Sequence, residues 1–523
     1  MIYRGVIMEG DIQIFCQVYV RDNMIDILRI RRNFLFLQWG FHILLYCLFL
    51  LFDLEKEANL LFVISFWYTI SYAYILYAEI KYSLDFNPFQ ILILSSIQFV
   101  GLNGISMYLN ILEGEEYKFG IYFINNYLQI GAYFLSLQHL LLYNGLCVVD
   151  YLRYKKDRNV CRMSIRNQIL NSNINYLKLA LIVYFSVWIL RAANLIFPLA
   201  TIGSFINNIA ADGHIVALFI LIYAKIQSPF DSKVLKIHWI IVAIEILISL
   251  DSGMKETILQ NLIPYCIYLL LAYKYGSLNF NFSFISKLIL IFIVVLNVFI
   301  YISVFRDLAI KRNVEWKDIK IEEVFLAYTD YLFRTGMYKN RDKETADKGL
   351  DYLMSRAGSI GCNSWSINYA TTKKTRPEYL YYCSFGLIPR ILWPGKPPVQ
   401  VGGMMYKLST GHESTWNKPI RGNICSVSIG FIGSCYFSLG IIGALIIPFF
   451  MGVFCALYWF FLKDRITHNF LAIWALWSMI AVFVKDCEAF QDCGIIFTAW
   501  SCVYMIVLKI FFKKNNSNIL IQD

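Results

Sequence analysis

Long runs of apolar residues recur along this chain and constrain its fold more than any other feature. An α-helix needs about 20 mostly apolar residues to cross the hydrocarbon core of a bilayer. Charged residues make up only 16% of the 523 residues, against about 25% in soluble domains, so most of the surface must face lipid. We therefore predict an all-α integral membrane protein with about 12 transmembrane helices: Phe34–Phe52, Leu60–Ile80, Phe89–Leu112, Ile121–Val149, Leu177–Ala200, Ile202–Tyr223, Ile237–Leu250, Ile258–Tyr273, Phe284–Phe305, Ile441–Leu462, Phe470–Val484 and Gly494–Phe512.

The Lys and Arg residues of the short loops fall on one side of this predicted topology. Residues 1–33 carry five Lys or Arg, and Asp150–Lys178 carries seven. Short acidic loops alternate with them, at Asp53–Glu57 and Glu113–Glu116. Short loops rich in Lys and Arg mark the cytoplasmic face of a membrane. We therefore expect both termini to be cytoplasmic.

The same topology divides the chain into three parts. Residues 1–305 carry nine predicted spans, residues 306–424 form one large external loop, and residues 425–523 carry the last spans. The loop holds 19 Lys or Arg against 12 Asp or Glu, and long loops translocate regardless of charge. The excess of Lys and Arg in this loop has two alternative explanations. One is attraction to anionic lipid headgroups, and the other is binding of an anionic substrate. Apolar residues at helical spacing predict two helices in the loop, Ile319–Leu332 and Glu344–Ile360.

Several catalytic classes leave no trace in this sequence. It contains no phosphate loop, no dinucleotide-binding fingerprint and no H-E-x-x-H zinc motif. Its six histidines are scattered, and no Cys/His spacing indicates a metal site. We therefore expect no metal, no other cofactor and no nucleic-acid partner.

The most specific segment is Ile388–Pro398, which reads IPRILWPGKPP and holds four of the eleven prolines. Proline fixes its own φ and pushes the preceding residue to extended conformations. The segment is therefore predicted to be a stiff, non-helical strut that presents Arg390, Trp393 and Lys396. A rigid loop with an interfacial Trp anchor is the alternative interpretation.

This segment resembles the PR-x-LWP-x-KP signature of the O-antigen polymerases, or oligosaccharide repeat-unit polymerases (the Wzy type). Weaker elements agree with the resemblance. The external turn Ser249–Glu256 is similar to the family's G-x-[KR]-G turn, although Glu256 stands where the family has a second Gly. A Gly-rich run from Gly430 to Gly443 leads into the next span. The motifs cover roughly residues 245–445, and the predicted topology covers the whole chain.

The resemblance implies a GT-C-like helical bundle in a bacterial plasma (inner) membrane. It implies a glycosyltransferase that polymerises oligosaccharide repeat units linked to a polyprenyl diphosphate such as undecaprenyl diphosphate. The product would be a surface polysaccharide, such as the O-antigen of lipopolysaccharide, a capsule or an exopolysaccharide. The implied partners are the lipid-linked oligosaccharide, membrane lipids and a chain-length regulator protein.

Candidate site residues follow from the chemistry of this transfer. Negative charge develops on the departing diphosphate, and Arg guanidinium groups match phosphate oxygens best. A carboxylate or His must accept the proton of the attacking sugar hydroxyl, and we leave open which residue is this base. The catalytic candidates are Arg306, Arg356 and Arg390 as cations, with Asp330, His412 and Glu413 as bases; the substrate-binding candidates are Lys255, Lys396, Trp393 and Asp251.

Arg191 is a further substrate-binding candidate because it falls inside the predicted span Leu177–Ala200. A charge there costs several kcal/mol unless it is paired. We consider Asp212 and Glu245 as partners within the bundle. A contact to the diphosphate or to a lipid channel is the functional interpretation, and a structural ion pair is the alternative.

Two other functions compete with polymerisation. A flippase for the same lipid-linked sugars would show related halves and charged residues in several spans, whereas here the distinctive residues collect in one loop. A ligase that transfers the finished polymer to an acceptor uses the same donor, so the sequence separates it poorly from a polymerase.

The topology has a direct test. Reporter fusions at Lys156 and Lys513 should read cytoplasmic, and a fusion at Lys343 should read external, because short basic loops lie on one side. Paired phosphatase and fluorescent-protein fusions measure this. An external signal at Lys156 would contradict the span count.

Overall fold

The computed structural model describes thirteen segments of the chain and the single positions 264, 301 and 408. The segments are residues 9–52, 58–82, 87–112, 118–119, 122–123, 127–156, 173–196, 202–228, 231–252, 322–329, 360–379, 430–463 and 470–484. The predicted spans Ile258–Tyr273, Phe284–Phe305 and Gly494–Phe512 lie outside these segments, as does the predicted helix Glu344–Ile360 apart from its last residue.

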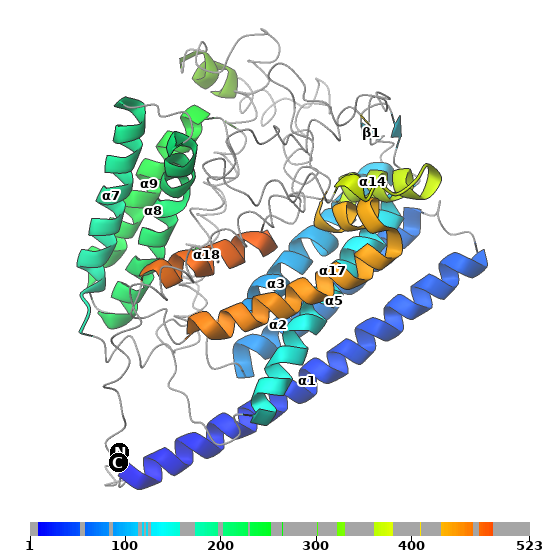
Figure 1. Cartoon of the computed structure of the whole chain (residues 1–523), viewed down its shortest axis with the longest axis horizontal. Helices are drawn as coiled ribbons and strands as arrows, with labels where there is room; N and C mark the ends of the chain where they lie inside the picture. The colour runs from blue at the N-terminus through cyan, green and yellow to red at the C-terminus, as the bar shows by residue number, and fades with distance from the viewer. Residues whose placement is uncertain are drawn as a thin grey trace. The chain divides into compact units, whose positions relative to one another are not determined.

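The chain divides into two compact units. The first comprises Met1–Ile165 with Ala357–Asp523, and the second comprises Arg166–Arg356. The first unit contains α1 (Glu9–Phe52), α2 (Ala58–Tyr82), α3 (Pro88–Ser96), the π-helix η2 (Ile97–Leu102), α4 (Asn103–Leu112), strands β1 (Lys118–Phe119) and β2 (Tyr122–Phe123), α5 (Leu128–Lys156), α14 (Ile360–Thr372), α17 (Phe431–Lys463) and α18 (Phe470–Val484) (Figure 1). The second contains α7 (Tyr176–Ile196), α8 (Ile202–Gln227) and α9 (Ser232–Ser252).

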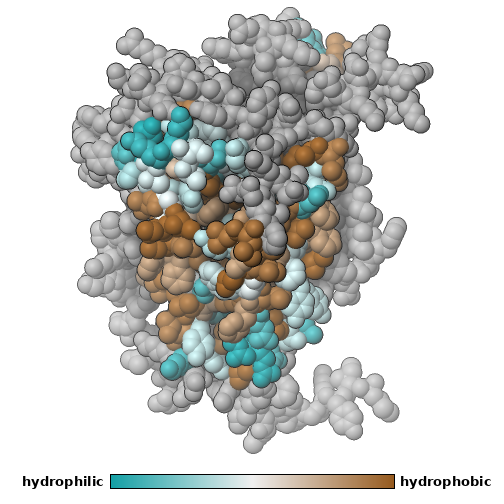
Figure 2. All heavy atoms as spheres, turned by 90° about the vertical axis from the view of Figure 1, so that its right-hand side faces the viewer, coloured by the Kyte–Doolittle hydropathy of each residue, from teal (hydrophilic) through white to brown (hydrophobic). Residues whose placement is uncertain are grey.

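Apart from the strand Tyr122–Phe123, the apolar runs form helices where the structure describes them, and the protein is a helical membrane protein. Five helices within the described residues are long and apolar enough to cross a membrane: Ile25–Leu51, Asn59–Tyr82, Pro88–Leu109, Leu128–Lys155 and Phe431–Lys463. On the face in Figure 2, hydrophobic residues cover the middle, and hydrophilic residues gather toward the upper and lower ends. This is the surface that a bilayer requires.

The interior of the first unit is built around α5, which α17 crosses at close range. Gly145 of α5 and Gly452 of α17 lie at the crossing, where a Cβ on either residue would meet the backbone of the other helix. Small residues allow this approach, and in a membrane close van der Waals packing is a principal force between helices. The two glycines therefore set the distance between the two central helices.

Helix α14 closes one end of this bundle. An added Cβ on Gly131 of α5 would meet Ser364 and the Ile360 carbonyl, so α14 packs directly on α5. Asp150, near the far end of α5, lies 19 residues after Gly131, which is roughly 28 Å of helix. The hydrocarbon core is about 30 Å thick, so this stretch of α5 is about as long as the core is thick.

Three details differ from the sequence prediction. The span predicted at Ile121–Val149 begins at Leu128, because Lys118–Phe119 pairs with Tyr122–Phe123 in an antiparallel ladder, and aromatic residues favour strands. The segment Phe89–Leu112 is helical but contains the π-helical stretch η2. Helix α14 was not predicted: it buries Asn363, Ser364 and Ser366 as well as apolar residues, so it shows no amphipathic stripe.

The helix predicted at Ile319–Leu332 is confirmed over residues 322–329. The segment Phe470–Val484, predicted as a span, forms a helix, α18, with the predicted bounds. The span Ile441–Leu462 is the second part of α17, which continues a helix Phe431–Leu439 beyond a break at Gly440 (φ 64°).

The crossing of α5 and α17 is testable with a matched pair of substitutions. Gly452→Ala places a methyl group against the Leu142 backbone, and overpacking of this kind typically costs about 1–3 kcal/mol. We expect a lower thermal midpoint for the detergent-purified protein. Gly40→Ala is the control, because nothing lies within 4 Å of a Cβ there. Equal thermal midpoints for the two variants would show that the close crossing of α5 and α17 does not contribute to the stability of the fold.

Candidate functional site

Most of the predicted site residues lie outside the described segments. These are the catalytic candidates Arg306, Asp330, Arg356, Arg390, His412 and Glu413, and the substrate-binding candidates Lys255, Trp393 and Lys396. Asp251 lies in the last turn of α9, and its side chain is not described. Arg191 is therefore the predicted site residue whose surroundings are defined.

Arg191 lies on α7 and meets residues from both neighbouring helices of the second unit. Its Nη1 donates to both carboxylate oxygens of Glu245 on α9, at 2.9 and 3.0 Å. Its Nη2 lies 3.1 Å from Nδ1 of His214 on α8. Of the two partners considered from the sequence, Glu245 forms an ion pair with Arg191. His214 is a partner that the sequence prediction missed.

Burial explains why these charges are paired. The Glu245 side chain is 3% exposed and the Arg191 side chain 22% exposed, and an unpaired charge at such a depth is costly. The guanidinium also lies 5.5 Å from the Trp188 ring. These contacts join α7, α8 and α9. A diphosphate contact at Arg191 would have to form beside these partners or replace them.

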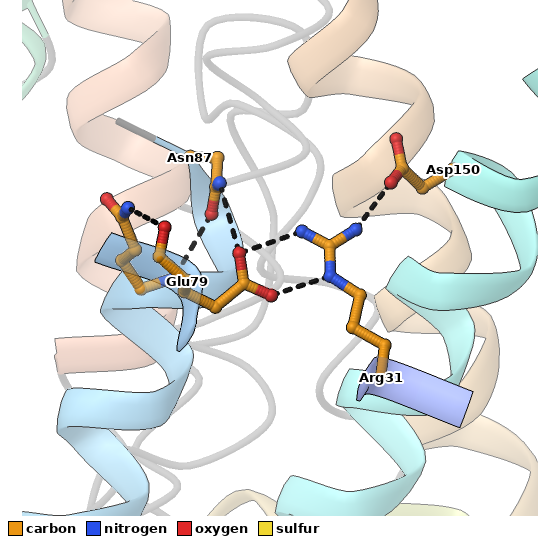
Figure 3. A network of polar contacts seen from close by, with 5 residues as sticks. Arg31, Glu79, Asn87 and Asp150 are labelled. Carbon is orange, nitrogen blue, oxygen red and sulfur yellow. Dashed lines mark hydrogen bonds and ion pairs between the residues drawn. The ribbon is translucent and has the colours of Figure 1, made fainter. Parts of the chain in front are cut away.

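A second charged cluster lies in the first unit, and sequence reasoning missed it. Arg31 of α1 donates from Nε and Nη2 to the two oxygens of Glu79 on α2, at 2.6 and 2.8 Å. Its Nη1 donates to Asp150 of α5 at 2.5 Å. Figure 3 shows the guanidinium between the two carboxylates. One residue therefore joins three helices.

The loop between α2 and α3 completes this cluster. Asn87 caps α3 by accepting the Gln90 N–H at 3.2 Å, and its Nδ2 lies 3.5 Å from a Glu79 oxygen. The Arg31 guanidinium stacks over Phe89 at 3.7 Å. One feature of the sequence could have indicated this cluster. Glu79 is an acidic residue inside the apolar run Leu60–Ile80, and such a residue needs a partner.

Two amide side chains cap α17 from other helices. The Ile432 N–H donates to Gln138 Oε1 on α5, and the Gly433 N–H donates to Asn363 Oδ1 on α14, both at 2.9 Å. The first N–H groups of a helix have no partner within it, so these bonds fasten the start of α17 to α5 and α14. Among the described residues, no group of three or more His, Cys, Asp or Glu side chains is placed to hold a metal ion.

A family model, described as a domain of unknown function (DUF8712), matches residues 133–520, which is more than half of the chain. This chain belongs to the DUF8712 family. The DUF8712 match includes Arg191, His214 and Glu245, together with the segment Ile388–Pro398. Arg31 and Glu79 precede the DUF8712 match. No curated protein and no solved structure matches the chain.

The Arg191 cluster predicts a specific pattern of stability. Glu245→Leu leaves Arg191 without its carboxylate partner, and breaking a buried pair costs about 3–5 kcal/mol, with less expected here because Arg191 is partly exposed. Arg191→Leu together with Glu245→Leu removes both charges and should recover most of the loss. Thermal unfolding of the purified variants measures this. A double variant less stable than Glu245→Leu would contradict the pairing.

Proposed function

We propose that this protein is a membrane glycosyltransferase that polymerises oligosaccharide repeat units carried on a polyprenyl diphosphate. The segment Ile388–Pro398, with its resemblance to the O-antigen polymerase signature, is the observation that carries the proposal. The helical membrane scaffold and the inclusion of this segment in the family match support it. We further propose that both termini are cytoplasmic, so that the reaction proceeds at the outer face of a bacterial plasma membrane.

The structure supports this proposal by fastening the chain on both sides of the segment at one place. Before it, the Arg376 N–H donates to the Phe437 carbonyl at 2.8 Å, and the Tyr379 hydroxyl lies 3.4 Å from Ser434 Oγ. After it, the chain enters α17 at Phe431. The described residues on either side of this segment, Tyr379 and Phe431, therefore both lie at the junction of α14 and α17. A lipid-linked donor would present its diphosphate at such an end of the bundle.

The proposed reaction is a single substitution at an anomeric carbon. The bond between that carbon and the diphosphate oxygen breaks, and the diphosphate departs on its polyprenol. The hydroxyl of the incoming unit forms the new glycosidic bond, and its proton passes to a base. We propose that Arg306, Arg356 and Arg390 stabilise the negative charge that develops on the departing diphosphate. Lys255 and Lys396 are supporting cations. Asp330, His412 and Glu413 are the candidates for the base, and Asp251 and Trp393 are assigned to substrate contact.

An assay with purified protein in detergent separates this proposal from its rivals. The probe is a polyprenyl-diphosphate-linked repeat unit, and the readout is the length of the lipid-linked product. Longer lipid-linked chains support a polymerase, whereas transfer only to an added acceptor indicates a ligase. An unchanged donor contradicts the proposed activity and is the result expected of a transporter.

Arg390 provides the sharpest test by substitution. A two-point grip on a diphosphate requires a planar guanidinium, which Lys cannot replace. Arg390→Lys and Arg390→Ala should therefore both lose polymer, by about 10²–10³ in rate if Arg390 is one preorganised donor, at normal protein level. The readout is polymer length on gels.

Trp393→Phe is the matched control, because it keeps an apolar anchor in the same segment and should be milder. Full polymer from Arg390→Lys with nearly full polymer from Arg390→Ala would exclude this segment from the active site.

A further inference from the structure

A turn rich in Lys and Arg follows α14. We call residues Lys373–Arg376 the basic turn. The Lys373 N–H donates to the Tyr369 carbonyl at 2.9 Å, and Arg376 Nη2 donates to the Tyr369 hydroxyl at 3.2 Å. The Arg376 N–H donates to the Phe437 carbonyl at 2.8 Å. The basic turn is thus held against both α14 and α17.

The break in α17 explains this attachment. In an unbroken α-helix the Ile441 N–H would donate to the Phe437 carbonyl. Gly440 adopts a φ of 64°, which is left-handed and readily available only to glycine. The Arg376 N–H donates to the Phe437 carbonyl beside this break, and Thr375 lies 3.5 Å from the Cβ position of Gly440. The backbone of the basic turn is therefore fixed by the shape of α17.

The basic turn presents cations outward. Lys373 and Lys374 are exposed, whereas the Arg376 side chain is 11% exposed. Glu378 is the acidic neighbour, with Oε1 3.7 Å from Arg376 Nη1. Residues 373–378 carry three cations and one carboxylate.

On both sides of the break at Gly440, α17 exposes apolar side chains. Leu439, Ile441 and Ile442 are 41%, 47% and 62% exposed, and Leu445, Ile446 and Phe450 continue the stripe. An exposed apolar stripe on a membrane-spanning helix faces lipid. The cations therefore lie where a lipid-facing surface ends, which is the level of lipid phosphates, and cations at such positions attract anionic headgroups.

We propose that the basic turn binds the phosphate of a membrane lipid whose hydrocarbon chain lies along the apolar stripe of α17. The ligand is defined by this pairing of a phosphate with a chain, which a glycerophospholipid and a polyprenyl diphosphate both offer. The site does not depend on the proposed polymerase activity. Stabilisation of the C-terminal end of α14 by Lys373 and Lys374 is the competing explanation, and it requires no bound lipid.

Lipid titration of the purified full-length protein, read by native mass spectrometry, tests the proposal. The probes are phosphatidylglycerol, undecaprenyl diphosphate and inorganic pyrophosphate. Lys373→Gln with Lys374→Gln should weaken lipid binding at least tenfold, because each cation near an anionic headgroup contributes about fivefold. Lys233→Gln with Lys236→Gln, which changes two exposed lysines of α9, is the matched control and should bind as the unsubstituted protein does.

The outcomes separate the sources of the phosphate. A loss confined to phosphatidylglycerol supports a bound structural lipid, and a loss confined to undecaprenyl diphosphate supports a site for a lipid carrier. If the Lys373→Gln, Lys374→Gln variant keeps its affinity for both lipids but has an altered thermal midpoint, the lipid site is contradicted. The two lysines would then only stabilise the end of α14. An equal loss in the control, or pyrophosphate binding as tight as lipid binding, would overturn it as well.

Discussion

Polar groups within the hydrocarbon core have no water to bond with, and the architecture of both units follows from that constraint. A helix satisfies its own backbone except at its ends and at breaks. In α17 those exceptions are covered by other elements: Gln138 and Asn363 cap its start, and Arg376 donates to the Phe437 carbonyl beside the break. Ser95 of α3 likewise donates to the Phe483 carbonyl near the end of α18, at 2.7 Å.

The same constraint governs charge. Arg31 and Arg191 each meet a carboxylate through two bonds, and each joins three helices of its own unit. An Arg guanidinium suits this task because its donors form a planar fork. Replacing such a cluster by apolar side chains is often neutral or stabilising, while removing one partner alone is not. Each cluster therefore joins three helices, and the presence of the ion pairs is by itself weak evidence of added stability.

The proposed function and the proposed lipid site both involve the junction of α14 and α17. Glycine backbone approaches at Gly131 and Gly433 bring α14 against α5 and α17, and the break at Gly440 receives the basic turn. This arrangement holds both ends of the 380–429 segment at one place. The basic turn is fastened beside the lipid-facing helix α17, and the proposed lipid site lies at this junction.

Hydrophobic length is a local property, so the sequence by itself determined the membrane class and the positions of α2, α7, α8, α9 and α18 to within a few residues. It also singled out Arg191, because a charge inside an apolar run stands out, and it named Glu245 as one of two partners. Tertiary structure alone decided the rest. Helix α14 buries polar and apolar residues alike, so its sequence carries no amphipathic stripe that would predict it. Arg31 resembled one more basic residue of a terminal segment, because Glu79 and Asp150, which neutralise it, lie 48 and 119 residues away.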